Sequence, residues 1–181
     1  MKISVFALIL SLVLFAGSPV TTSAEEGFAT PTIDIGVVVS DLDAAAKFYT
    51  EAVGFKEVQG FTVDAEFSTD SGLTRNKKLD IRVFVLGEGA GATKLKLMQV
   101  PGVESKKADN QFIHSQLGFS YLTVMVKSTD ATLARLKKAG VKPIAKGPVT
   151  LPSNLDPSLS LTIVKDPDGN FVELVGPKPT K

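Results

Sequence analysis

The stretch Ile35–Phe55, IGVVVSDLDAAAKFYTEAVGF, predicts a strand, a helix start and a helix stop in succession. Its valines belong to a β-branched run, and the segment Ser40-Asp41-Leu42-Asp43 that follows is typical of a helix N-terminus with a capping side chain. Apolar residues then recur at helical spacing, and Gly54 offers the left-handed conformation that often follows a helix. We therefore expect a strand over 33–39 and an amphipathic helix that packs on a sheet.

Three further strands complete this first unit. Apolar runs predict them at 55–60, 79–86 and 93–99, and the glycine-rich segment 87–91 is best explained as a hairpin turn between the last two. The predicted order is βαβββ.

The second half of the chain repeats this order. A strand is predicted at 119–126, and a helix that opens at Ser128 ends at Gly140. Strands are predicted next at 141–145, 159–165 and 170–175, with the turn Asp166-Pro167-Asp168-Gly169 between the last two. Two comparable βαβββ modules indicate an internal repeat and an α+β fold.

The N-terminus has the layout of a signal peptide. Lys2 precedes the apolar stretch 3–16, and small residues at 22–24 suit a signal peptidase, so we expect cleavage near Ala24 and a periplasmic or secreted product. The apolar stretch is shorter than the roughly 20 residues that span a bilayer, which argues against stable membrane insertion. The expected organisation is a signal peptide at 1–24, a mature N-terminal segment at 25–31 and one domain at 32–178. That domain comprises module one (32–102), a polar linker (103–117) and module two (118–178).

Composition excludes several classes of protein. The formal net charge of the 181-residue chain is +1, and loss of Lys2 with the signal peptide makes it zero, which argues against general nucleic-acid binding. The chain has no cysteine, so disulfides and thiolate zinc sites are excluded. We expect a packed core to supply the stability.

Two motifs resemble the vicinal-oxygen-chelate superfamily of glyoxalase, bleomycin-resistance and extradiol-dioxygenase proteins. IGVVVSDLDAAAKFYTEAVGF is similar to the opening of these domains, and KDPDGNFVELVGP at 165–177 is similar to their ending. The resemblance implies two βαβββ modules whose curled sheets enclose a cavity, often in a homodimer. It also implies that the polar segment Phe61–Lys78 can fold over the cavity mouth as a lid. Because the superfamily contains both enzymes and ligand-binding proteins, the fold alone leaves the function open.

The resemblance implies four metal-binding positions, one on the first and one on the last strand of each module. In the family's enzymes these side chains hold a divalent ion that polarises substrate oxygens. Here the corresponding residues are Asp34, Lys96, Tyr121 and Glu173. Glu173 matches the family pattern and Asp34 is able to ligate a metal, whereas a protonated lysine cannot and a neutral phenol is a poor ligand. No metal or other cofactor is therefore expected, and a bound divalent ion would be held by Asp34 and Glu173.

Three of these four residues also have a purely structural explanation. Asp34 is explained equally by solvation at a strand end, and Tyr121 by packing in the core. A register shift of one residue would turn Lys96 to the opposite face of its strand. If all four side chains point inward, Lys96 would lie between the carboxylates of Asp34 and Glu173, and Tyr121 would be available to donate a hydrogen bond to a ligand. Apolar candidates for the cavity wall are Phe67, Phe84, Met98, Phe119 and Met125.

Three functions remain consistent with the sequence, and whether the protein is an enzyme stays open. The leading hypothesis is an exported protein that binds a small molecule in a metal-free or atypical cavity. The alternative is a metal-dependent lyase, isomerase or dioxygenase with a divergent ligand set led by Asp34 and Glu173. A third is a metal-free enzyme in which Lys96 or Tyr121 acts in acid–base catalysis, which requires burial to move its pKa towards neutrality.

Overall fold

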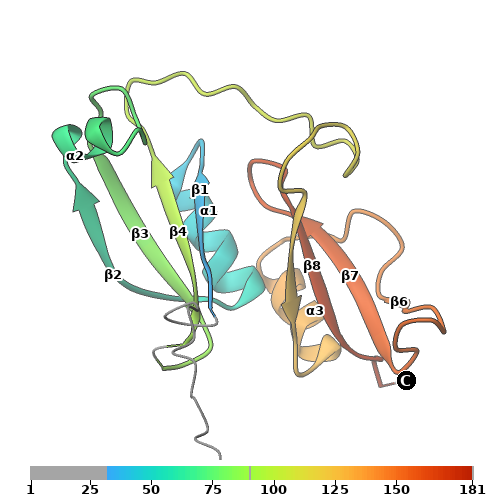
Figure 1. The fold of residues 1–181 in the computed structure, drawn as a ribbon. Helices are drawn as coiled ribbons and strands as arrows, with labels where there is room; N and C mark the ends of the chain where they lie inside the picture. The colour runs from blue at the N-terminus through green and yellow to red at the C-terminus, as the bar shows by residue number, and fades with distance from the viewer. Residues whose placement is uncertain (1–31, 90, 181) are drawn as a thin grey trace, which may run out of the picture.

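The computed structural model of the chain describes residues 32–89 and 91–180, so the predicted signal peptide and mature N-terminal segment lie outside the described residues. Figure 1 shows two four-stranded sheets side by side, each with a helix on the far side of the view. The fold is α+β, as the sequence predicts. No helix within the described ranges is long and apolar enough to cross a membrane.

The first sheet has the strand order β1-β4-β3-β2, with β1 and β4 parallel and the other pairs antiparallel. Its elements confirm the predicted βαβββ order and add a short helix, α2. In chain order they are β1 (Asp34–Val38), α1 (Leu42–Lys47), the π-helical turn η1 (Phe48–Val53), β2 (Lys56–Val63), α2 (Ala65–Asp70), β3 (Leu79–Leu86) and β4 (Thr93–Gln99).

The second sheet repeats this topology with the order β5-β8-β7-β6, in which β5 and β8 are parallel. Its elements are β5 (Tyr121–Met125), α3 (Thr129–Lys138), β6 (Val149–Thr150), β7 (Leu159–Lys165) and β8 (Phe171–Pro177).

The ends of the helices follow the predicted chemistry. The Asp41 carboxylate accepts a hydrogen bond from the backbone N–H of Ala44 at 2.9 Å, and the Ser128 hydroxyl accepts one from Ala131 at 3.2 Å. Gly54 (φ 103°) and Gly140 (φ 71°) follow the two helices in the left-handed region that glycine adopts without steric cost. Local sequence thus determines where both helices begin and end.

One prediction about local structure is wrong. The segment 141–145 is not a strand, and the pairing with β7 begins only at β6. Pro143 and Pro148 lack the N–H that a strand would contribute, and Ile144 alone donates a backbone hydrogen bond to Ile163 at 3.0 Å. In the polar segment Phe61–Lys78, the first residues extend β2 and α2 follows. Asp64 caps α2 by accepting a hydrogen bond from the N–H of Phe67 at 2.7 Å.

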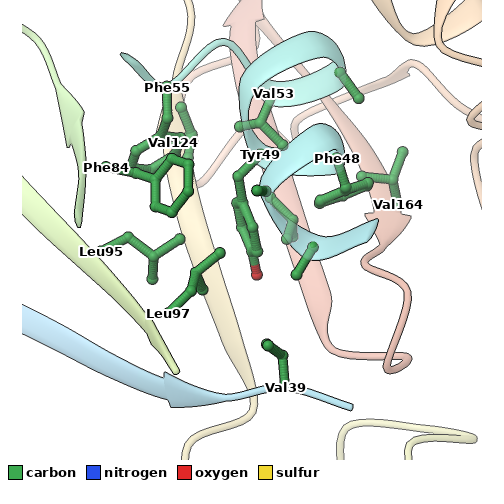
Figure 2. Close-up of a cluster of buried hydrophobic side chains, with 14 of the residues drawn as sticks. Val39, Phe48, Tyr49, Val53, Phe55, Phe84, Leu95, Leu97, Val124 and Val164 are labelled. Atoms are coloured by element: carbon green, nitrogen blue, oxygen red, sulfur yellow. The ribbon is translucent and has the colours of Figure 1, made fainter. Parts of the chain in front are cut away.

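The two modules share one hydrophobic core on the helix side of both sheets. Figure 2 shows Tyr49 and Phe48 of η1 among side chains from both sheets. Burial of this apolar surface against both sheets is the main force that holds the modules together. The largest fully buried side chains of the core are Tyr49, Phe84, Leu95, Leu97, Leu136, Leu174, Val164 and Val172.

A buried hydrogen bond joins the modules within this core. The Tyr49 hydroxyl donates to Asp166 Oδ2 at 3.0 Å, and both residues are at most 5% exposed. Asp166 also accepts hydrogen bonds from the Asn170 side chain and from the backbone N–H groups of Asp168 and Asn170. Burial, and then the nearby negative charge of Asp166, raise the pKa of Tyr49, so its hydroxyl stays protonated as the donor. A second link is the hydrogen bond from Arg135 Nη2 to the carbonyl of Val53 at 3.2 Å.

The hydrogen bond between Tyr49 and Asp166 predicts a specific loss of stability on mutation. Tyr49→Phe removes the donor while it keeps the ring, and should lower the free energy of unfolding by about 1–2 kcal/mol because a buried carboxylate loses a hydrogen bond. Denaturant unfolding monitored by circular dichroism measures the effect. The matched control is Tyr121→Phe, which makes the same change at a half-exposed tyrosine and should leave stability within about 0.5 kcal/mol of the wild type. Equal stability of Tyr49→Phe and wild type would contradict a stabilising role for this hydrogen bond.

Candidate binding cavity

All four predicted site residues lie on the helix-free faces of the two sheets. In β1 and β4 the residues alternate between the core and the opposite face, and Asp34 and Lys96 fall on the opposite face. In β5 and β8 the same alternation places Tyr121 and Glu173 on the helix-free face. Figure 1 shows these faces on the same side of the molecule, turned away from α1 and α3.

Asp34 and Lys96 form an ion pair across neighbouring parallel strands. Lys96 Nζ lies 2.8 Å from Asp34 Oδ2, and the two side chains are 29% and 36% exposed. The hydrogen bond from Lys96 holds the pKa of the Asp34 carboxyl below its usual value, and the charges of Lys96 and Lys94 act in the same direction. Lys96 Nζ also lies 5.9 Å from the ring centre of Phe61, within reach of a cation–π contact. Solvent screens a pair this exposed, so its contribution to stability is small.

Glu173 and Tyr121 have different surroundings from those of the ion pair. Glu173 Oε2 accepts a hydrogen bond from the hydroxyl of Thr123 at 2.7 Å, on the neighbouring parallel strand. Tyr121 is 50% exposed, so it is not a core aromatic residue. The structure therefore brings Asp34 and Lys96 into direct contact, while Glu173 has Thr123 as its partner.

This donor set does not fit a metal ion of the kind that the family resemblance implies. The Asp34 carboxylate is neutralised by an ammonium group, and Lys96 itself occupies one of the four expected ligand positions. Within the described residues no three His, Cys, Asp or Glu side chains are grouped so that they could hold one ion. We therefore derive no chemical step that depends on a metal.

A cavity of about 520 Å³ lies between the edge strands β1 and β5. Asp34 and Tyr121 line it, whereas Lys96 and Glu173 do not. Among the predicted apolar wall residues, Phe119 lines the cavity, while Phe84 is fully buried in the core, so that prediction for Phe84 is wrong. The full lining is Ile33, Asp34, Ile35, Gly36, Val37, Val38, Tyr49, Phe119, Ser120, Tyr121, Leu122, Asn170 and Phe171.

Sequence reasoning missed most residues that line this cavity, among them the aromatic residues Tyr49 and Phe171. Tyr49 fits the apolar stripe of a helix, and that pattern indicates only a core residue. In the structure Tyr49 also lines the space between the sheets. Phe171 lies on the helix-free face of β8 beneath the ammonium group of Lys165, which is 4.6 Å from its ring centre. The motif around Glu173 could have pointed to Phe171, because residues two apart on a strand share a face.

A second cavity of about 380 Å³ lies where the linker passes the end of β4. It is lined by Ser40, Gln99, Asp168, Asn170 and linker residues that include Lys106 and Lys107. None of the four predicted site residues contributes to it. We therefore treat the cavity between β1 and β5 as the candidate binding cavity.

Several solved structures share this fold at low sequence identity. A glyoxalase family protein from Bacillus cereus is 19% identical, with 85% of this chain and 97% of that chain covered and a TM-score of 0.66. A glyoxylase/bleomycin resistance protein/dioxygenase domain from Frankia sp. is 20% identical, with coverages of 86% and 94% and a TM-score of 0.57. A mutant of glyoxalase I from Zea mays is also 20% identical and has a TM-score of 0.56. The match covers 80% of this chain and 46% of that chain. At these identities the similarity establishes the fold alone.

Comparison with curated proteins gives no match. The model of the Glyoxalase/Bleomycin resistance protein/Dioxygenase superfamily matches residues 33–174, which includes all four predicted site residues and both sheets except the last residues of β8. The chain therefore belongs to the Glyoxalase/Bleomycin resistance protein/Dioxygenase superfamily.

Proposed function

We propose that this protein binds a small molecule in the cavity between β1 and β5 and does so without a metal ion. The observation that carries the proposal is the Asp34–Lys96 ion pair, which replaces two expected metal-ligand positions at the side of a cavity. The volume of about 520 Å³ is within the range of roughly 300–1,000 Å³ that is usual for ligand sites. Aromatic side chains and a few uncharged polar groups line it, as in many sites for small organic ligands.

The ion pair supports a binding role for a physical reason. A carboxylate that already has an ammonium partner at 2.8 Å gains less from a metal ion, because Lys96 must first be displaced and its positive charge lies beside the site. Glu173 alone retains the family's acidic residue, and Thr123 donates a hydrogen bond to it.

Metal analysis tests the metal-free part of the proposal. We expect protein purified without chelators to contain much less than one equivalent of nickel, zinc, iron or manganese per chain. Inductively coupled plasma mass spectrometry measures this content. Glu173→Ala should leave that content unchanged. A stoichiometric metal that is lost in Glu173→Ala would instead support the alternative of a metal-dependent lyase, isomerase or dioxygenase.

The ion pair also predicts the titration of Asp34. Because its folded-state pKa is lowered, the pair stabilises the protein at pH values above the ordinary aspartate pKa of about 3.9. That stabilisation is lost as the pH falls through the lowered pKa. Carboxyl titration by nuclear magnetic resonance should show a higher midpoint in Lys96→Met than in wild type. The control Lys94→Met should shift it less, because Lys94 acts through its charge without a hydrogen bond. Identical midpoints in wild type and Lys96→Met would exclude the pair in solution.

We further propose export to the periplasm or medium and assembly as a homodimer. The signal-peptide pattern at 1–24 supports export, and exposed apolar side chains on the helix-free faces, including Val38, Phe61 and Met125, support a partner copy over these faces. Native mass spectrometry of protein from the periplasmic fraction should show twice the mass of residues 25–181. A full-length mass would contradict cleavage, and a single-copy mass at micromolar concentration would contradict the dimer.

A further inference from the structure

The long walls of the cavity are the unpaired edges of two strands. Among residues 32–89 and 91–180, β1 and β5 each bond to one neighbouring strand, and Figure 1 shows them side by side and running in opposite directions. The backbone N–H of Val39 donates to Met98 of β4, so alternate residues of β1 face β4 and the others face the opposite way. Asp34, Gly36 and Val38 therefore direct their N–H and C=O groups away from β4, towards the cavity.

The same alternation holds for β5. The N–H of Val126 donates to Val175 of β8 at 2.7 Å, which places the backbone groups of Tyr121, Thr123 and Met125 on the free edge. Of these three residues Tyr121 lines the cavity, opposite Asp34, Gly36 and Val38 of β1, so backbone donors and acceptors border the cavity on both sides. Such groups hydrogen-bond to hydroxyl, carbonyl and amide groups and carry no net charge.

The side chains of the lining add little charge. Asp34 is the one residue with a charged side chain among those that line the cavity, and Lys96 neutralises it at 2.8 Å. The amide of Asn170 is already engaged, because its nitrogen donates to Asp166 and its oxygen accepts from Asn110. Phe119, Tyr121 and Phe171 contribute aromatic surface. A charged ligand would lose hydration here without gaining an unpaired counter-charge.

We propose that the cavity between β1 and β5 selects uncharged, flat, largely apolar molecules that carry hydroxyl, carbonyl or amide groups able to pair with the two strand edges. This inference rests on the proposed small-molecule binding and specifies the chemical class of the ligand. Aromatic faces contact the flat body of the ligand, and the strand edges bind its polar groups. Drug-sized molecules with an ionised group bind more weakly because of the cost of desolvation.

A matched pair of fluorescent probes tests the charge preference. N-phenyl-1-naphthylamine is uncharged, and 8-anilinonaphthalene-1-sulfonate has the same ring system with an added sulfonate. Fluorescence titration of the full chain at neutral pH should give a dissociation constant for the uncharged probe that is lower by at least about tenfold. Equal or tighter binding of the sulfonate would overturn the inference.

Variants locate the binding to this cavity. Gly36→Val should weaken binding of the uncharged probe by about tenfold or more by placing a side chain in the cavity. The strand should tolerate it, because a Cβ at this position meets only the Met98 methyl at 3.5 Å. Phe119→Ala removes a fully exposed ring from the rim and should also weaken binding without affecting the core. The control Leu155→Ala removes an exposed apolar side chain that does not line the cavity.

The outcomes separate this inference from the proposed function. If the sulfonate binds better and Gly36→Val weakens that binding, the cavity binds small molecules but the uncharged class is wrong. If neither probe responds to Gly36→Val or Phe119→Ala, both the inference and the proposed cavity are wrong. The N-terminal apolar stretch is present in every variant, so differences between variants report the cavity alone.

Discussion

The arrangement of the two modules depends on their shared hydrophobic core and on the hydrogen bond between Tyr49 and Asp166 buried within it. Its donor belongs to the first module and its acceptor to the second, and both groups are buried. Separation of the modules would expose the shared core and break this bond, which would leave the Tyr49 hydroxyl without its partner and remove one of the donors to Asp166. η1 of the first module also packs against α3 of the second, and Arg135 donates a hydrogen bond to the carbonyl of Val53. These contacts hold the same two modules together. The relative position of β1 and β5 follows from these contacts.

The relative position of β1 and β5 explains why backbone groups line the candidate cavity. No other strand of the described part of the chain pairs with the outer edge of β1 or β5, and Tyr49 of η1 lines the space on the core side. Exposed edges usually promote aggregation, and proteins cover or shorten them. Here the two edges face a shared cavity, where their polar groups are available to a ligand but less accessible to another strand. Tyr49 belongs to both features, since its ring lines the cavity while its hydroxyl bonds to Asp166.

Sequence predicted those parts of the fold that depend on neighbouring residues. Both helix caps and both closing glycines are local signals, and each is found where it was expected. The strand over 141–145 was predicted from apolar residues alone, and the missing N–H groups of Pro143 and Pro148 outweighed that preference. The Tyr49–Asp166 bond was beyond such reasoning, because its partners are 117 residues apart and no local pattern pairs them.

Within the candidate site, too, some contacts can be predicted from the sequence and others depend on how the strands pair. The contact between Asp34 and Lys96 follows from the topology of one module, because parallel β1 and β4 place these residues on the same face of adjacent strands. The partner of Glu173 depends instead on the register of β5 against β8, which places Thr123 directly beside it. The substitution of a lysine for an expected metal ligand therefore has a consequence beyond the loss of one ligand. It neutralises the carboxylate at the cavity wall, and the proposed ligand would then make most of its polar contacts with the strand edges.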